Sequence, residues 1–176
     1  MVPNLDRIKA FLFDVDGVLT DSTAICSTTN DEAVRAFNEK DGHGMRMAVL
    51  NGYGLGVITG GRCNSVKMRV MRFGVKESDV YLHAKNKMVA FLDYCSRHGY
   101  DPSEVAYFGD DIPDIAVMKR CGLAIAPADA VDETKEAADY VSENPGGKCC
   151  VRKGIEMVLK AQGKWVFDVD KYDALF

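Results

Sequence analysis

Hydrophobic and polar residues follow one another along the chain in two alternating patterns. Five short apolar runs rich in strand-forming residues lie at 8–15, 55–59, 80–82, 104–109 and 123–126. Between and after them, apolar residues recur at spacings of three and four, which predicts helices at 42–52, 63–74, 86–99, 112–122, 131–140 and 151–163. Apolar strands that alternate with helices predict an α/β fold, a doubly wound, Rossmann-like parallel sheet with helices on both faces.

One segment departs from this alternation. In residues 19–38, threonines and aliphatic residues alternate around the sequence TTND, a pattern typical of a β-hairpin. We expect this hairpin to project from the sheet just after the first strand. It follows a cluster of aspartates, so a functional role stays open beside that of a plain connecting loop.

Composition and charge narrow the class of protein. The chain has 176 residues, of which 47% are hydrophobic and 27% charged, which is typical of one globular domain spanning 1–176. The formal net charge of −4 provides no basic field to attract nucleic acid or an anionic membrane. No apolar segment approaches the length of a membrane span, so we expect a cytoplasmic protein with neither kind of partner.

The six cysteines do not follow a pattern of metal ligands or disulfides. There is no CxxC motif, and Cys149 and Cys150 are adjacent. Cys95 and His98 lie one helical turn apart, but no second pair accompanies them. We therefore expect reduced, mostly buried thiols rather than a zinc site.

Polar residues that could carry chemistry follow the ends of the predicted strands. They are Asp14 and Asp16 after the first strand, Thr59, Gly60 and Gly61 after the second, Lys87 (with Lys85 as an alternative) at the start of a helix, and Asp110, Asp111 and Asp114 after the fourth strand. Because the carboxyl ends of parallel strands share one edge of the sheet, we expect these residues to meet in one crevice.

This set of residues suits the transfer of a phosphoryl group to a carboxylate. An aspartate can attack phosphorus and carry the group as an acyl phosphate. Attack of one anion on another requires a hard cation, and Mg²⁺ is held by one or two carboxylates with water and substrate phosphate. A lysine, a hydroxyl and the N–H groups of a glycine turn can hold phosphoryl oxygens. A second aspartate can exchange a proton with the leaving group and then with water.

The letters DVD alone are weak evidence, because residues 168–170 repeat them near the C-terminus. That copy lacks the glycine and threonine that follow the first one, and we interpret it as part of a solvated tail. The first copy is specific because DVDGVLTD, VITGG, a later lysine and GDDIPD occur in that order.

DVDGVLTD (14–21), ITGG (58–61), NK (86–87) and GDDIPD (109–114) resemble the four signature motifs of the haloacid dehalogenase-like phosphatases. The resemblance implies that Asp14 is the nucleophile and Asp16 the general acid and base. It further implies that Thr59 binds the phosphoryl group and that Lys87 balances the negative charge.

The same resemblance implies a Mg²⁺ site. Asp110, the Asp14 carboxylate and the Asp16 backbone carbonyl would bind the ion. Asp111 and Asp114 would hold the water ligands of the ion and the lysine, without contacting the ion themselves.

Within this family the chain resembles the capless type. About 37 residues separate Asp21 from Thr59 and about 27 separate Thr59 from Lys87, which leaves no room for a cap domain. The hairpin, KDGHGMRMA (40–48), the glycine pair at 146–147 and AQGK (161–164) are similar to the small phosphatases of 3-deoxy-manno-octulosonate 8-phosphate. That resemblance implies a phosphorylated sugar acid as substrate, a role in lipopolysaccharide biosynthesis, and a homotetramer. In it, the hairpin and the C-terminal tail (164–176) would help to close a neighbour's site.

Two positions that flank the substrate depart from the family pattern. Gly61, followed by Arg62, stands where an arginine is common, and Cys149 and Cys150 stand where glycine and alanine are common. Arg69 matches a family arginine thought to face the sugar acid's carboxylate. We expect substrate contacts from Gly60, Gly61, Arg62 and Arg69, although the two arginines can also belong to a solvated strip or a subunit contact. A nine-carbon keto sugar acid 9-phosphate is the alternative substrate.

Two functions of other classes remain to be weighed. A phosphoacceptor receiver module uses the same residue types, but its acidic pair lies on the first strand and its phosphorylated aspartate ends a middle strand. In this chain Asp14 and Asp16 follow the first strand and the acidic pair Asp110 and Asp111 follows the fourth, which is the opposite order. A catalytically silent binding subunit is the other possibility, and the intact motifs argue against it.

Overall fold

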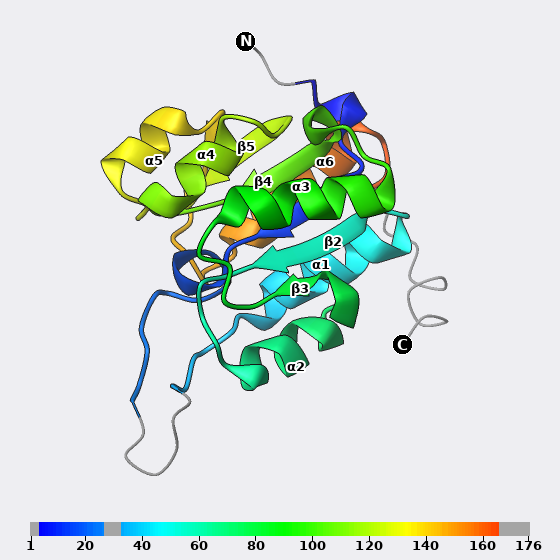
Figure 1. Ribbon diagram of the computed structural model, residues 1–176. Helices are drawn as coiled ribbons and strands as arrows, with labels where there is room; N and C mark the ends of the chain where they lie inside the picture. The colour runs from blue at the N-terminus through cyan, green and yellow to red at the C-terminus, as the bar shows by residue number, and fades with distance from the viewer. Residues whose placement is uncertain (1–3, 27–32, 166–176) are drawn as a thin grey trace.

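The computed structural model describes residues 4–26 and 33–165, which form one six-stranded sheet between two layers of helices (Figure 1). The strands are β1 (Ala10–Phe13), β2 (Gly54–Ile58), β3 (Val80–Tyr81), β4 (Val105–Phe108), β5 (Leu123–Ala126) and β6 (Tyr140–Val141). They pair in the order β3-β2-β1-β4-β5-β6, and every pair is parallel. The predicted doubly wound parallel sheet is therefore confirmed.

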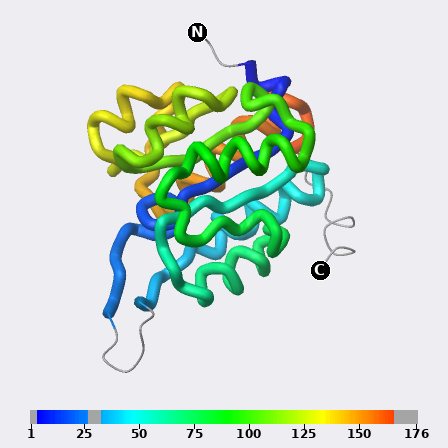
Figure 2. The backbone as a smooth tube through the Cα atoms, in the orientation of Figure 1, coloured from blue at the N-terminus to red at the C-terminus, as the bar shows by residue number. Residues whose placement is uncertain are grey.

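Helices cover both faces of this sheet. They are α1 (Glu39–Leu50), α2 (Asn64–Arg72), α3 (Lys87–His98), α4 (Ile115–Met118), α5 (Asp132–Ala137) and α6 (Cys150–Ala161). Buried side chains of α1, α2 and α6 pack with Phe11 and Phe13, whereas those of α3 and α4 pack with Ala10 and Leu12. Alternate residues of β1 thus face opposite layers, which explains why the whole strand is apolar. The tube view in Figure 2 follows the same layers along the backbone.

The sheet's strand order places the ends of β1 and β4 at the centre of the molecule. From β1 the chain runs outward through β2 to β3, then returns to β4 on the other side of β1 and continues to β6. A crevice forms beyond the carboxyl ends of the strands where the direction of winding reverses. Asp14 follows β1 and Asp110 follows Gly109 after β4, so both lie at this reversal.

Two predicted helices differ from the observed elements. In the segment 131–140, the helix α5 ends at Ala137, and Tyr140 begins the two-residue strand β6. The segment 112–122 is a 3₁₀ turn, η5 (Ile112–Asp114), followed by the single turn α4. Pro113, the second residue of η5, lacks a backbone N–H and suits only the first turn of a helix, so a tight turn precedes α4.

The predicted hairpin at 19–38 is present as two arms, an outgoing arm (19–26) and a returning arm (33–38). Both project from the carboxyl edge of the sheet (Figure 1). Within the described residues, the arms pair through one antiparallel bridge, in which Ile25 and Val34 exchange backbone hydrogen bonds of 3.1 and 2.9 Å. Residues 27–32, at the predicted tip, and 166–176, most of the predicted C-terminal tail, lie outside the described residues. Across 4–26 and 33–165, no helix combines the length and the apolar character that a membrane crossing requires.

Candidate active site

The loop after β1 approaches the loop after β4 closely. Residues Val15–Leu19 form one wide helical turn, η2, in which Gly17 has a φ of 94°. A Cβ atom on Gly17 would lie 1.9 Å from Asp110 Oδ2. Glycine is thus required here both for the left-handed backbone and for the space that the Asp110 carboxylate occupies.

A buried lysine joins two of the predicted site residues. Lys87, the first residue of α3, places its Nζ 3.0 Å from Asp14 Oδ1 and 2.7 Å from Asp114 Oδ1. All three side chains are buried. The distant motifs at 14, 87 and 114 therefore meet in one ion cluster, whereas Lys85 is exposed.

The electrostatics of this cluster leave Asp14 short of positive charge. Burial lowers the pKa of Lys87, but the carboxylates of Asp14 and Asp114 outweigh it, so the pKa lies above its usual value and the lysine stays charged. Burial raises the pKa of Asp14 to about 8, because the opposing effect of Lys87 is smaller and Asp114 adds repulsion. A further cation is needed for Asp14 to be fully ionised at neutral pH.

The carboxylates present fit a divalent cation between Asp14 and Asp110. Oxygens of Asp14, Asp110 and Asp114 lie within 4.8 Å of one another. Asp114 is already saturated, because it accepts hydrogen bonds from Lys87 Nζ, Tyr107 Oη and the backbone N–H groups of Asp110 and Asp111. Asp110 Oδ1, in contrast, is buried and has no hydrogen-bond partner among the described residues. Two hard oxygen ligands with an unsatisfied buried atom suit Mg²⁺.

Thr59 and the glycines that follow it lie beside Asp16. Thr59 is buried, and its Oγ1 accepts a hydrogen bond of 3.0 Å from the N–H of Gly61. A Cβ atom on Gly61 would lie 3.2 Å from Thr59 Oγ1 and 4.0 Å from Asp16 Oδ2. The position where the family commonly has an arginine therefore lies beside Thr59 and Asp16, and in this chain it carries no side chain.

Arg35, which lies outside the four sequence motifs, contacts the predicted acid and base residue Asp16. Arg35 lies on the returning arm, and its Nε and Nη2 donate to Asp16 Oδ1 and Oδ2 at 2.5 and 3.1 Å. One signal could have identified it: Arg35 is the first basic residue after the aspartate cluster.

The side chains of Arg69 and Asp111 contact groups outside the carboxylate cluster, and that of Arg62 is exposed. Arg69 pairs with Glu39 and stacks over the Phe73 ring at 4.6 Å. Arg62 is exposed, and the exposed Asp111 uses its carboxylate to accept from the N–H of Ile112 at the start of η5. The side chain of Asp111 thus caps a turn, and that of Asp114 anchors the lysine.

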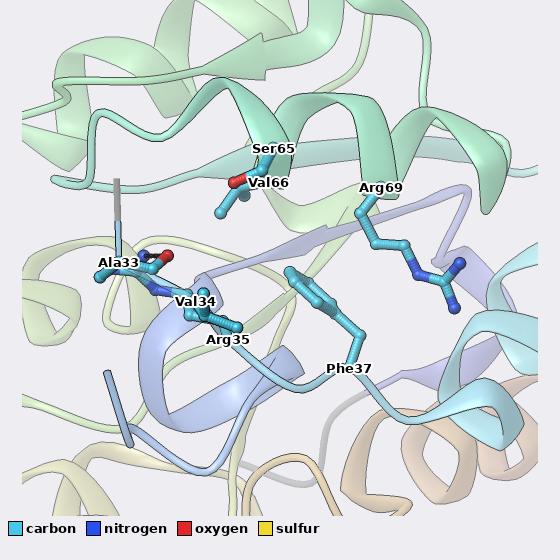
Figure 3. A pocket seen from close by; sticks show the side chains of 7 residues that line it. All are labelled: Ala33, Val34, Arg35, Phe37, Ser65, Val66 and Arg69. Atoms are coloured by element: carbon cyan, nitrogen blue, oxygen red, sulfur yellow. Dashed lines mark hydrogen bonds between the residues drawn. The ribbon is translucent and has the colours of Figure 1, made fainter. Parts of the chain in front are cut away.

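Arg69 and Arg35 line one pocket of about 460 Å³. Figure 3 shows its lining, with Ala33, Val34, Arg35 and Phe37 from the returning arm facing Ser65, Val66 and Arg69 from α2. Because Arg35 reaches Asp16 from this pocket, the pocket adjoins the crevice.

The second departure from the family pattern lies at the start of α6. Cys149 has a φ of 76°, a left-handed conformation that suits glycine better. Its N–H and that of Arg152 donate to the buried carboxylate of Asp41 at 3.0 and 2.7 Å. In the preceding turn, a Cβ on Gly146 would lie 1.9 Å from the carbonyl oxygen of Gly17. The segment around Cys149 is therefore packed against the loop that carries Asp16.

Comparisons with known proteins agree with this geometry. Residues 62–146 match the model of the haloacid dehalogenase-like hydrolases. The chain is 37% identical to the 3-deoxy-D-manno-octulosonate 8-phosphate phosphatase KdsC of Escherichia coli (strain K12), over 93% of this chain and 86% of the relative.

Two solved structures are similar over nearly the whole chain. One is the cobalt-bound form of the corresponding phosphatase of Haemophilus influenzae, with a TM-score of 0.88, 34% identity, and coverage of 96% of this chain and 94% of the other. The other is the phosphatase of Moraxella catarrhalis in complex with a magnesium ion, a phosphate ion and a KDO molecule. Its TM-score is 0.87 and its sequence is 30% identical, and the match covers 98% of this chain and 95% of the Moraxella chain.

Proposed function

Because the chain belongs to the 3-deoxy-D-manno-octulosonate 8-phosphate phosphatase family of haloacid dehalogenase-like hydrolases, we propose that it hydrolyses this sugar phosphate to the free sugar acid and phosphate. The protein is a Mg²⁺-dependent phosphomonoesterase, and we propose that its reaction serves lipopolysaccharide biosynthesis. The observation that carries the chemistry is the buried Asp14, paired with Lys87, which Asp114 anchors, beside the unsatisfied Asp110 Oδ1. The relative that binds magnesium, phosphate and KDO together supports the substrate.

The first half of the proposed reaction forms a phosphoryl-enzyme. A carboxylate oxygen of Asp14 attacks phosphorus, the bond from phosphorus to the sugar oxygen breaks, and Asp16 gives its proton to that oxygen. Thr59 Oγ1 and the N–H of Gly60 hold phosphoryl oxygens, while Lys87 balances their charge. Mg²⁺, when bound by Asp14, Asp110 and the backbone carbonyl of Asp16, neutralises the charge of nucleophile and phosphate.

The second half of the reaction restores the enzyme. A water molecule attacks phosphorus and gives a proton to the Asp16 carboxylate, which is the base left by the first half. The bond from phosphorus to the Asp14 oxygen breaks, and inorganic phosphate leaves. The order of events returns Asp14 as a carboxylate and Asp16 as an acid, ready for the next substrate.

One variant tests the proposed nucleophile. Asp14→Asn keeps the shape of the side chain but removes the attacking charge, so we expect phosphate release with Mg²⁺ to fall by at least about 1,000-fold. Asp6→Asn, in the exposed 3₁₀ turn Leu5–Arg7, serves as the control and retains most activity. Substantial turnover by Asp14→Asn would remove it from the role of nucleophile.

A nine-carbon keto sugar acid 9-phosphate is the second candidate substrate. Gly61 favours it, because the arginine that the family commonly has is absent from this position beside Thr59 and Asp16. Phosphate release from the eight-carbon and nine-carbon substrates, with a simple aryl phosphate beside them, decides between the two. We expect the highest kcat/KM with the eight-carbon compound, and a clear preference for the nine-carbon compound would reverse the assignment.

We also propose that the chain is one capless phosphatase domain, acts in the cytoplasm, and assembles as a homotetramer with sites shared between subunits. Exposed apolar side chains on the projecting arms and on α2 support the assembly, namely Ile25, Val34 and Met68, which are 64, 60 and 58% exposed. Light scattering on the purified protein should give four times the chain mass of 19.3 kDa. A monomer mass would contradict the shared site.

A further inference from the structure

We propose that Arg35 is a positioning residue, which orients the Asp16 carboxylate for proton transfer to the leaving oxygen. Through this contact the projecting arm helps to set the geometry of the acid and base. The inference rests on the proposed function, because it assumes that Asp16 exchanges protons with the substrate and with water.

The contact holds both oxygens of Asp16. Nε and Nη2 of Arg35 donate to Oδ1 and Oδ2, the two-pronged arrangement in which a planar guanidinium fixes both the position and the plane of a carboxylate. Elsewhere in the described chain, the Asp16 carboxylate accepts a hydrogen bond from Thr20 Oγ1, at 3.5 Å. That distance is at the limit of a hydrogen bond, so the rotamer of Asp16 depends mainly on Arg35.

Arg35 is itself held in place, which makes it a support rather than a mobile counterion. Its Nη1 donates to the carbonyl oxygen of Ala33 at 3.2 Å and to Cys63 Sγ at 3.1 Å. Cys63 is buried and directly precedes α2. The Arg35 side chain is only 11% exposed, whereas Asp16 is 36% exposed and faces the crevice. One guanidinium therefore joins the arm, the base of α2 and the acid and base residue.

Orientation matters most when the leaving oxygen needs a proton. General acid catalysis contributes about 10²–10⁴-fold, and a carboxylic acid that points in the wrong direction loses much of this. A leaving group that is itself a weak base departs without help. If Arg35 positions Asp16, its removal slows esters of weakly acidic alcohols and phenols and spares esters of strongly acidic phenols.

The test uses a series of substituted phenyl phosphates, which carry no carboxylate that Arg35 could bind as substrate. The full-length enzyme with Mg²⁺ is compared with Arg35→Ala, Arg35→Lys and a matched control, Arg72→Ala, whose side chain is exposed at the end of α2. The measured quantity is the slope of log kcat/KM against the pKa of the leaving phenol.

We expect Arg35→Ala to steepen this slope, with a loss of roughly 10- to 100-fold on phenyl phosphate and less than about threefold on 4-nitrophenyl phosphate. Arg35→Lys keeps the charge but not the fork, and it should give an intermediate slope. It also decides the question if Arg35→Ala fails to fold. Arg72→Ala should reproduce the wild-type line.

Two results would overturn the proposal. Equal losses across the series would show that Arg35 serves the fold or phosphoryl binding, and an unchanged line would show that it does not act on Asp16. Failure of the proposed function has a different signature, because the wild-type enzyme itself would then release no phosphate from any member of the series or from the sugar phosphate.

Discussion

Replacement of Asp114 by asparagine tests the energetics of the buried ion cluster. Asp114 is fully buried, and its two oxygens accept from two side chains and two backbone N–H groups. Oδ1 accepts from Lys87 at 2.7 Å and from Tyr107 at 2.6 Å, while Oδ2 accepts from the two N–H groups at 3.2 and 3.4 Å. An amide has one acceptor oxygen, so Asp114→Asn points an NH₂ group at one pair of donors.

The magnitude follows from the loss of charge in a buried site. Removing one partner from a buried ion pair costs about 3–5 kcal/mol. The lower end applies, because Lys87 keeps Asp14 at 3.0 Å. With roughly 2–4 °C per kcal/mol in a chain of this length, a loss of about 3 kcal/mol lowers Tm by about 6–12 °C. Activity should fall as well, because Lys87 loses its closer anchor.

Thermal unfolding followed by circular dichroism measures this effect, with urea unfolding as an independent check. Asp111→Asn is the matched control three residues earlier in the same turn, and its exposed carboxylate accepts from the N–H of Ile112. We expect its Tm to stay within about 2 °C of the wild type. A shift below about 2 °C for Asp114→Asn would refute the view that Asp114 anchors the lysine.

Three further predictions concern the cation site. Burial raises the pKa of Asp14 to about 8 and that of Asp110 to about 6. Mg²⁺ should therefore bind more tightly as pH rises from 6 to 8, and its binding at pH 7 should release protons from these carboxyl groups. Calorimetry in buffers of different ionisation enthalpy measures this, and a proton count of zero would contradict it. Because the folded pKa of Asp14 lies above its ordinary 3.8, the metal-free fold should also lose stability as pH rises from about 4 to 8. Gly17→Ala should weaken Mg²⁺ binding at least about tenfold, because the added Cβ displaces Asp110. The control, Gly52→Ala, has a φ of 82° and open space around it, so it should lower only the stability. Equal Mg²⁺ affinities in the two variants would contradict the close approach of Gly17 to Asp110.

The sheet and the carboxylate cluster could be predicted because their signals are local. Each long strand is an apolar run, and residues that follow parallel strands must meet at one edge. Strand β6 was not predicted, because the helical pattern at 131–140 extends over Tyr140 and leaves no separate apolar run for Tyr140 and Val141. The projecting arms were expected from alternation, and within the described residues they pair through the bridge between Ile25 and Val34.

The contact of Arg35 with Asp16 has only one weak signal in the sequence, the position of Arg35 as the first basic residue after the aspartate cluster. Arg35 reaches Asp16 only because the chain turns back between them, and the position of the arms depends on packing rather than on sequence spacing. The exposed fractions of Asp111 and Asp114 could not be predicted, since both lie in one short acidic stretch. The turn at η5 directs Asp114 inward and Asp111 outward.

In the proposed reaction, Asp14 carries the phosphoryl group during turnover. The most direct measurement quenches the Mg²⁺-activated enzyme during hydrolysis of 3-deoxy-D-manno-octulosonate 8-phosphate, reduces any acyl phosphate with borohydride, and maps the modified residue by mass spectrometry. An aspartyl phosphate is reduced to homoserine, so we expect homoserine at position 14, present with substrate and absent without it. Turnover that leaves Asp14 unmodified, or that labels another carboxylate, would contradict it.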